Sequence, residues 1–315
     1  MAMNAVARLD AEPPAHPIAH IVEAGLSAVE ARMQDACKSD VSILNDASHH
    51  ILSAGGKRVR PRLVLLSYLA CGGAAVDSVI SLAAALELVH TASVVHDDIN
   101  DHGVVRRGKP SVNAIWGRTF ALLTGDFLFT KVYELMAPHH DMNVILAEAT
   151  VALVEGETLQ AQAVKEQRFT RQVYMDIIAR KTASLFSAGG LMGARAANAN
   201  DRVAEALGRY GFNIGLAFQI VDDILDLTAD EAQLGKTAGL DLKQGRGIGS
   251  INSGAAPDPV TLIKAKALNS NSVAEGKLQA KMLIDSAIGE LDVLSDSPAK
   301  DELVALARYI VERDH

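Results

Sequence analysis

The sequence predicts an all-α protein, built as a single large bundle of long helices. Apolar residues recur at helical spacing over most of the chain. No segment shows a useful length of the alternation that marks a β-strand. Aromatic residues make up only 4% of the chain, whereas Ala and Leu, two strong helix formers, dominate the 49% that is hydrophobic. Together these observations favour a helical bundle over a sheet protein.

One folded domain is expected over residues 18–315, after a mobile tail at 1–17. The tail mixes Ala, Pro and charged residues, and helical spacing begins only after it. The rest of the chain is longer than a usual domain, but single-core enzymes of this size exist. No linker divides it into two.

The individual helices follow from apolar spacing and from the residues at their ends. Gly55-Gly56 and Gly72-Gly73 are typical of helix stops, and Pro61 fits the first turn of the next helix. Residues 228–259 are rich in Gly and charge and are expected to be irregular. The expected helices cover residues 18–33, 42–52, 63–71, 76–95, 116–136, 144–164, 171–192, 203–227, a stretch from 260, 278–294 and 302–311.

Composition and charge exclude several classes of function. A net charge of −8 argues against a nucleic-acid partner, whose phosphates require a basic surface. Cys37 and Cys71 have no metal or redox spacing and are expected to be reduced thiols. The N-terminus lacks a secretion signal, and the longest uncharged runs, such as 63–76, are too short to span a bilayer. We therefore expect a cytoplasmic protein without a transmembrane segment.

Three aspartates stand at the end of a long apolar segment. Asp97, Asp98 and Asp101 have the spacing DDxxD. Residues four apart on a helix differ by about 40° in azimuth, so Asp97 and Asp101 share a face and Asp98 lies beside it. Like charges this close destabilise a helix unless a cation enters, and Mg²⁺ prefers carboxylates together with the phosphates of a substrate. The pattern predicts a magnesium site.

A second cluster with the same spacing lies 222 − 97 = 125 residues downstream. Asp222, Asp223 and Asp226 again end an apolar run. Two acidic helix faces of this kind predict a clamp, in which metal ions between the faces hold a polyphosphate.

Positive charges gather in two places. At a helix start, cations oppose the macrodipole, so an anion that faces both the cations and the helix end explains the first group better than a solvated surface does. The second group is either a salt-bridged surface or, beside bound metal, a set of forks for phosphate oxygens. The first group is Lys57, Arg58, Arg60 and Arg62, and the second is Arg106, Arg107 and Lys109.

These segments together resemble the trans-polyprenyl (isoprenyl) diphosphate synthase family. The resemblance runs from about residue 18 to the C-terminus, and two DDxxD motifs in this order with the basic motifs are highly specific. It implies the isoprenoid synthase fold, in which long helices surround a central cavity. The segments that carry it are GGKRVRP at 55–61, ELVHTASVVHDDINDHGVVRRGKP at 87–110, GD at 125–126, KTASL at 181–185, FQIVDDILD at 218–226 and LGK at 234–236.

The resemblance implies a prenyltransferase that ionises an allylic diphosphate with the help of Mg²⁺ and condenses it with isopentenyl diphosphate. Three Mg²⁺ ions are implied, with Asp97, Asp101 and Asp222 as ligands and Asp98, Asp223 and Asp226 in support. Further contacts to the allylic diphosphate are implied for Arg106, Lys181 and Lys236, which complete the expected catalytic set. The diphosphate of isopentenyl diphosphate is assigned to Lys57, Arg60, His90 and Arg107. Thr182 and Gln219 match positions near the reacting carbons, where their dipoles favour a passing cation.

The resemblance also leads us to expect a product longer than farnesyl. In the family, the fifth and fourth residues before the first aspartate form a floor when they are bulky, and here they are Ala92 and Ser93. One helical turn rises about 5.4 Å, comparable to one isoprene unit, so an open turn admits roughly one more unit. The next layer is Leu88 and Val89, with Phe127 or Phe129 as stoppers. A long-chain product for a quinone side chain is expected.

The family resemblance also implies a homodimer. Two alternative functions remain open. A terpene cyclase also ionises an allylic diphosphate, but it has no second diphosphate for the basic residues to hold. A non-catalytic regulatory subunit of a heteromeric synthase would be expected to lose aspartates, and both clusters are intact. The loop at 241–259 keeps this second alternative open, because it has Arg246 where a lysine is usual and lacks the usual Thr-Leu-Pro.

Overall fold

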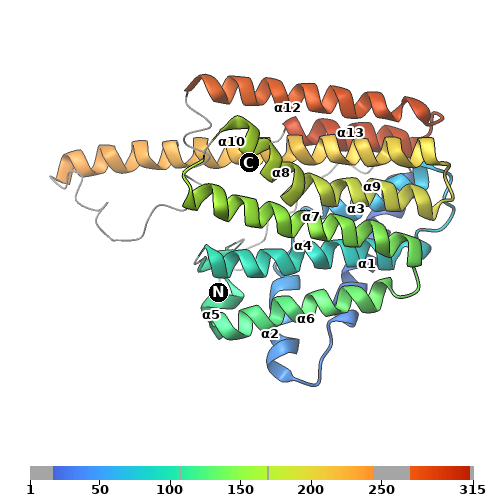
Figure 1. The fold of residues 1–315 in the computed structure, drawn as a ribbon, viewed down its shortest axis with the longest axis horizontal. Helices are drawn as coiled ribbons and strands as arrows, with labels where there is room; N and C mark the ends of the chain where they lie inside the picture. Colours follow the sequence, from blue (N-terminus) through green and yellow to red (C-terminus); the bar gives the residue numbers. More distant parts are fainter. Residues whose placement is uncertain (1–16, 102, 107, 169, 245–269, 313–315) are drawn as a thin grey trace, which may run out of the picture.

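Long helices form almost the whole protein, as the sequence predicts (Figure 1). The computed structural model describes residues 17–101, 103–106, 108–168, 170–244 and 270–312, with the side chains of the longest helix described up to Leu225. Within these residues the only strands are β1 (Val105–Arg106) and β2 (Lys109–Pro110), which pair as a small antiparallel hairpin. The prediction of an all-α fold is confirmed.

The N-terminal part of the bundle is arranged around one central helix, α4. This helix packs against α1, α3 and α6. Leu82 to Val89 lie almost wholly out of contact with solvent, which makes this segment the middle of the core. The helices are α1 (Pro17–Ala36), α2 (Ser42–Leu52), α3 (Val59–Ala70), the 3₁₀ turn η1 (Val76–Val79), α4 (Ile80–Asn100), α5 (Val112–Trp116), α6 (Arg118–Met136) and α7 (His140–Lys165).

The C-terminal part continues the bundle on the other side of α3. There α9 packs against α3 and α10, and α10 packs against α12 and α13. The elements are α8 (Arg171–Ile178), the π-helical turn η2 (Ala179–Ala183), α9 (Ser184–Ala196), α10 (Asp201–Gln244), α12 (Ser270–Glu290), the 3₁₀ turn η4 (Leu291–Val293) and α13 (Pro298–Glu312).

Glycines bring α9 unusually close to both of its neighbours. A Cβ on Gly190 would collide with the backbone carbonyl of Leu207 on α10. A Cβ on Gly193 would lie 2.5 Å from the carbonyl oxygen of Val64 on α3. Because no side chain separates the backbones at these points, α3 and α10 pack tightly on either side of α9, and both of them line the cavity described below.

The segment Val76–Asn100 is long and apolar enough to cross a membrane by length and composition alone. Most of it, 72% of its apolar window, is buried inside the protein. The expectation about uncharged runs did not consider this stretch, because Asp77, Glu87, Asp97 and Asp98 lie within it. Its burial is that of a core helix of the bundle.

Several helix ends differ by a few residues from the sequence-based expectation, and three differences are larger. Residues 228–244 continue α10 instead of starting an irregular stretch, because Ala229 and the run Glu231 to Leu234 are good helix formers and no proline interrupts them. The helix expected over 171–192 contains the π-helical turn η2, and α5 was not expected. Of the predicted tail only Pro17 is among the described residues, and of the atypical 241–259 loop only 241–244 are.

Candidate active site

A cavity of about 740 Å³ opens between α3, α4, α10 and the η2 turn. Residues predicted from two distant parts of the sequence line it together. They are Lys57, Arg60, His90, Ser93, Asp97, Asp101, Arg106, Lys181, Thr182, Gln219 and Asp222. A second hollow of about 580 Å³, between α10, α12 and α13, is lined by none of these residues.

Several predicted residues lie behind the cavity wall or outside the described part of the chain. Asp98 and Asp223 are each only 2% exposed. The predicted floor residues Leu88, Val89 and Ala92 are fully buried and, among the described residues that line the cavity, only Ser93 represents this floor. Those that the structure does not describe are Arg107 and the side chains of Asp226 and Lys236.

The first aspartate cluster divides into two roles at the end of α4. Asp97 and Asp101 both face the cavity, and the Asp101 amide donates a hydrogen bond to the Asp97 carbonyl oxygen at 2.8 Å. Asp98 turns away and accepts two hydrogen bonds from Arg106, from Nε at 3.0 Å and from Nη2 at 2.7 Å. Asp98 therefore ties the β1–β2 hairpin to α4 and fixes the guanidinium of Arg106 at the rim of the cavity.

Lys181 carries the positive charge on the opposite wall. Its Nζ lies 2.7 Å from Glu157 Oε1 on α7 and 3.3 Å from Asp97 Oδ2. Burial lowers the pKa of Lys181, but Asp97 and Glu157 outweigh burial, so the net pKa is raised and the side chain is charged. The pKa of Glu157 is raised to about 7, because burial and the negative charge of Asp97 together outweigh the opposing effect of Lys181.

Glu157 was not predicted from the sequence, and neither was the glycine before it. A single carboxylate on a long helix has no distinctive spacing, so its position beside Lys181 emerges only when α7 packs on η2. Gly156 permits that packing, because a Cβ there would lie 2.6 Å from the backbone nitrogen of Lys181.

A chain of hydrogen bonds leads from η2, at the surface of the cavity, to the buried aspartate of the second cluster. Thr182 Oγ1 donates to Gln219 Oε1 at 2.8 Å, and Gln219 Nε2 donates to Asp223 Oδ1 at 3.0 Å. The Tyr174 hydroxyl donates to the other carboxylate oxygen of Asp223 at 2.7 Å. Asp222, the neighbour of Asp223, faces the cavity. Tyr174 on α8 is a second residue that sequence reasoning missed.

The basic cluster before α3 also separates into different roles. Arg58 has a left-handed backbone (φ 48°), and its buried guanidinium lies 2.9 Å from Glu87 and 3.1 Å from Glu30. Arg62 lies 2.6 Å from Glu23 on α1. Lys57 and Arg60 are the members of the predicted diphosphate set that line the cavity from this segment.

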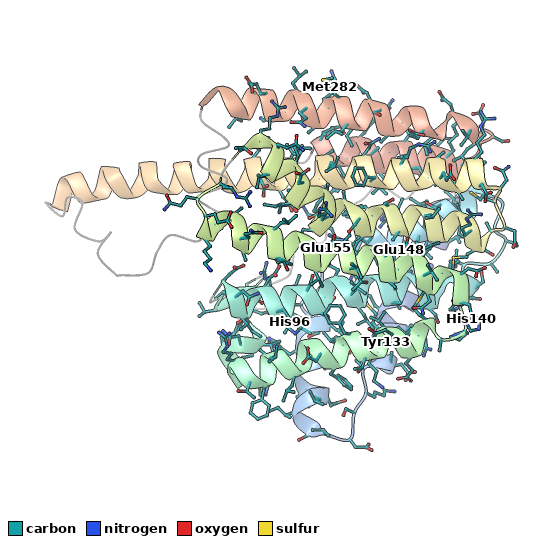
Figure 2. The ribbon with its side chains drawn as sticks, in the orientation of Figure 1. His96, Tyr133, His140, Glu148, Glu155 and Met282 are labelled. Atoms are coloured by element: carbon teal, nitrogen blue, oxygen red, sulfur yellow. The ribbon has the colours of Figure 1, made fainter. Side chains whose placement is uncertain are left out.

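The Gly125-Asp126 pair on α6 is explained by its contact with His96. This histidine lies between α4 and α6 (Figure 2), 3.5 Å from Asp126 Oδ1. A Cβ on Gly125 would collide with the His96 ring. The pair therefore positions α6 against the end of α4, one residue from Asp97.

The carboxylates of this cavity suit a hard divalent cation such as Mg²⁺ only when a bound substrate supplies further oxygen atoms. No group of three histidine, cysteine, aspartate or glutamate side chains in the described part of the chain is arranged to hold a metal. The aspartates that face the cavity, Asp97, Asp101 and Asp222, come from two separate walls, and the other carboxylate in the lining, Glu87, is paired with Arg58. Mg²⁺ is usually bound in this way, through one or two carboxylates with waters and substrate phosphates completing its shell.

Comparison with known proteins extends this picture over most of the chain. The sequence profile of the polyprenyl synthetase family matches residues 41–252. The octaprenyl diphosphate synthase of Escherichia coli is 33% identical over 311 residues, which cover 92% of this chain and 96% of that protein. The geranylgeranyl diphosphate synthase of Methanosarcina mazei is 36% identical over 293 residues, covering 86% and 90%.

A solved structure gives the same result for the fold. The polyprenyl synthase of Caulobacter crescentus, crystallised with calcium and isoprenyl diphosphate, superimposes with a TM-score of 0.79 at 30% identity and covers 96% of this chain and 100% of that one. The family profile, the relatives and the shared all-α isoprenoid synthase fold agree, and we conclude that the chain belongs to the polyprenyl synthetase family of prenyltransferases.

Proposed function

We propose that this protein is a trans-polyprenyl diphosphate synthase that joins isopentenyl diphosphate to an allylic diphosphate and makes a product longer than farnesyl. The observation that carries the proposal is a single cavity with acidic residues on two walls and a separate basic group on a third side. A reaction between two diphosphates needs both groups, because each headgroup requires its own neutralising partners.

The allylic diphosphate is assigned to the acidic side of the cavity. We assign Asp97, Asp101 and Asp222 as ligands of Mg²⁺, with three ions in the site, and Asp98, Asp223 and Asp226 as their support. Bound Mg²⁺ would supply positive charge that stabilises the diphosphate as it leaves. Arg106, Lys181 and Lys236 add fixed positive charge toward the same headgroup.

Isopentenyl diphosphate is assigned to the basic side, where Lys57, Arg60, His90 and Arg107 would hold its diphosphate. This places its double bond beside the allylic carbon once the C–O bond has broken. Thr182 and Gln219 line the wall between the two sides, where their oxygens stabilise the allylic cation before the double bond attacks it. The proton lost afterwards passes to the departed diphosphate. Phe218 and Val94 also line the cavity and help to exclude water, which would quench the cation.

The remaining readings fit this site less well. A terpene cyclase has one diphosphate to bind and leaves the basic group without a role. A non-catalytic subunit has no use for a cavity that carries acidic residues on both walls. We also propose that residues 18–315 act as one folded unit in the cytoplasm and that the small residues Ala92 and Ser93 allow the product to grow past farnesyl.

A homodimer is part of the proposal, and exposed apolar side chains support it. The outer faces of α6 and α7 expose large apolar residues that a monomer would leave in water. They are Phe120, Leu122, Leu123 and Tyr133 on α6, and Val144, Val151 and Val154 on α7. A second copy docked on these faces would bury them.

The direct test is incubation with isopentenyl diphosphate, Mg²⁺ and dimethylallyl, geranyl, farnesyl or geranylgeranyl diphosphate in turn. Chromatography of the extracted lipids should show chains lengthened by successive five-carbon units, and EDTA should abolish the product. Cyclic hydrocarbons would identify a cyclase instead. Activity only after a second protein is added would identify a subunit of a heteromeric enzyme.

A further inference from the structure

Asp223 belongs to the second aspartate cluster, yet its carboxylate does not line the cavity. It is 2% exposed, and each of its oxygens accepts a hydrogen bond from another side chain, Oδ1 from Gln219 at 3.0 Å and Oδ2 from Tyr174 at 2.7 Å. The pKa of Tyr174 is raised by burial and by the negative charge of Asp223, so the phenol keeps its proton and remains a donor.

These two bonds determine which end of the Gln219 amide faces the cavity. Tyr174 holds one oxygen of the Asp223 carboxylate, and the other oxygen accepts from Gln219 Nε2, so the NH₂ of the amide faces Asp223. The amide oxygen then lies on the opposite side, where Thr182 Oγ1 donates to it at 2.8 Å. Gln219 and Thr182 line the cavity, whereas Asp223 lies behind it.

We propose that Tyr174 and Asp223 are positioning residues, which hold the Gln219 amide with its oxygen toward the cavity and its NH₂ away from it. The inference rests on the proposed function, because the amide orientation matters for a reaction with a cationic intermediate. An amide oxygen carries partial negative charge and stabilises a cation, whereas an NH₂ group in the same place would repel it. The residues act through Gln219 and touch no reacting atom.

Tyr174→Phe keeps the ring but removes the hydrogen bond to Asp223 Oδ2, so the carboxylate that positions Gln219 is no longer held on that side. We expect kcat to fall about tenfold while the KM values for both diphosphates stay within twofold, because substrate headgroups bind elsewhere. Tyr210→Phe is the matched control. Tyr210 on α10 is fully buried, its hydroxyl donates to the Leu303 carbonyl oxygen at 2.6 Å, and it is not among the residues that line the cavity. Its kcat should stay within twofold of the wild type.

Exchanging the hydrogen-bond donor and acceptor between positions 219 and 223 tests whether Asp223 positions Gln219 or only stabilises the fold. In Asp223→Asn, Tyr174 donates to the new amide oxygen, so the new NH₂ meets Gln219 and turns its oxygen away from the cavity. In the double variant Gln219→Glu/Asp223→Asn, the NH₂ at position 223 donates to the carboxylate at position 219, which again presents oxygen to the cavity. We expect kcat to fall at least tenfold in Asp223→Asn and to recover several-fold in the double variant.

A measurement without turnover tests the same claim. The side-chain amide protons of Gln219 can be followed by ¹H–¹⁵N NMR and assigned by the signals that Gln219→Glu removes. They should exchange slowly with solvent in the wild type and at least tenfold faster in Asp223→Asn. A double variant as inactive as Asp223→Asn, or wild-type Gln219 protons that exchange as fast as those of an exposed glutamine, would overturn the proposal. Absence of wild-type turnover would instead reject the proposed function, and the exchange rates would still decide the amide orientation.

Discussion

At the scale of single residues, neighbouring cations with the same sequence context have different roles. The sequence groups Lys57, Arg58 and Arg60 as one anion site. All three residues line the cavity, but the Arg58 guanidinium is held in ion pairs with Glu87 and Glu30. Sequence alone cannot distinguish the role of Arg58 from that of its neighbours, because the carboxylates that pair with Arg58 lie on α1 and α4, about thirty residues away on either side.

The buried pair of Arg58 and Glu87 gives a prediction for stability and for substrate binding. Glu87→Ala should lower the free energy of unfolding by about 3 kcal/mol, because it leaves a buried guanidinium with only Glu30 as a charged partner. The loop that carries Lys57 should loosen as a result, so the KM for isopentenyl diphosphate should rise more than the KM for the allylic substrate. Urea unfolding and steady-state kinetics measure the two effects.

The control for this variant is an exposed ion pair on another helix. Glu155 lies on the surface of α7 (Figure 2), 2.9 Å from Arg180, and both side chains are about half exposed. Glu155→Ala should change the free energy of unfolding by less than about 1 kcal/mol. Equal losses in the two variants would mean that burial of the Arg58 pair contributes nothing.

Residue-level prediction succeeded where helical periodicity alone sets the geometry. Asp97 and Asp101 share a face because they are four apart, and the structure places both on the cavity. Glu157 and Tyr174 could not be predicted, since each matters through a contact with a different helix. For Asp98 and Asp223, spacing identified the cluster but could not show that both carboxylates turn into the core.

At the scale of elements, the distance between α7 and η2 controls the position of Lys181. Gly156→Ala would place a Cβ 2.6 Å from the Lys181 nitrogen and 3.0 Å from its Cα, so the backbone of η2 must move. We expect a loss of about 1–3 kcal/mol in the free energy of unfolding from this overpacking. We also expect kcat to fall at least tenfold, because Lys181 moves relative to Asp97.

Gly289→Ala on α12 is the matched substitution for this prediction. A Cβ there meets nothing within 4 Å, and the backbone is helical. The variant should be as stable as the wild type or more stable by about 0.5–1 kcal/mol, since alanine is the better helix former. Its kinetics should be unchanged. If Gly156→Ala also leaves kcat unchanged, close packing of α7 on η2 does not position Lys181.

The contact between α4 and α6 carries the prediction of product length. Ala92 is fully buried on α4 and does not itself line the cavity, but His90 and Ser93 on either side of it do. Ala92→Phe should place a ring across the path of the growing chain and shorten the product by at least one five-carbon unit. Chromatography of the products measures the length. Ala305→Phe, on the exposed face of α13, adds the same ring elsewhere and should leave the length unchanged.

Helices were predicted well from sequence, except where local signals conflict or are weak. Apolar spacing located the long helices because each buries one face in the bundle. It missed the π-helical turn, because one extra residue in a turn does not change composition. It also ended α10 too early, since Gly235 and Gly239 suggested a loop while their neighbours favour helix.

At the scale of the whole molecule, the apolar faces of α6 and α7 predict the oligomeric state. The chain has a mass of 33.3 kDa, so a dimer should have 2 × 33.3 = 66.6 kDa by light scattering. Tyr133→Lys/Val151→Lys replaces two side chains that are 72% and 58% exposed, and should yield the monomer mass. Charge at the centre of such a face opposes its burial.

A control pair tests whether any apolar surface would behave in this way. Leu278 and Met282 are 60% and 63% exposed on the outer face of α12, at the opposite edge of the bundle from α6 (Figure 2). Leu278→Lys/Met282→Lys should keep the dimer mass. A monomer in the wild type, or dimers in both double variants, would show that α6 and α7 do not form the interface.

For the molecule as a whole, fold class and family were predictable from sequence because they rest on patterns spread over most of the chain. Two DDxxD motifs, together with the basic segments before and between them, also predicted residues that line one cavity in the structure. Product length was not fixed in this way. The relatives include an octaprenyl and a geranylgeranyl synthase at similar identity to this chain, so overall identity does not distinguish the two product lengths.

The π-helical turn makes this enzyme depend on the number of residues in one helix as well as on their identity. Deleting a single residue from Ala179–Ala183 would turn everything before it by about 100° relative to α9. Tyr174 would lose Asp223 while almost every recognisable motif stayed in the gene. Such a protein would still be assigned to the family by any sequence comparison, although the deletion of one residue would have removed its activity.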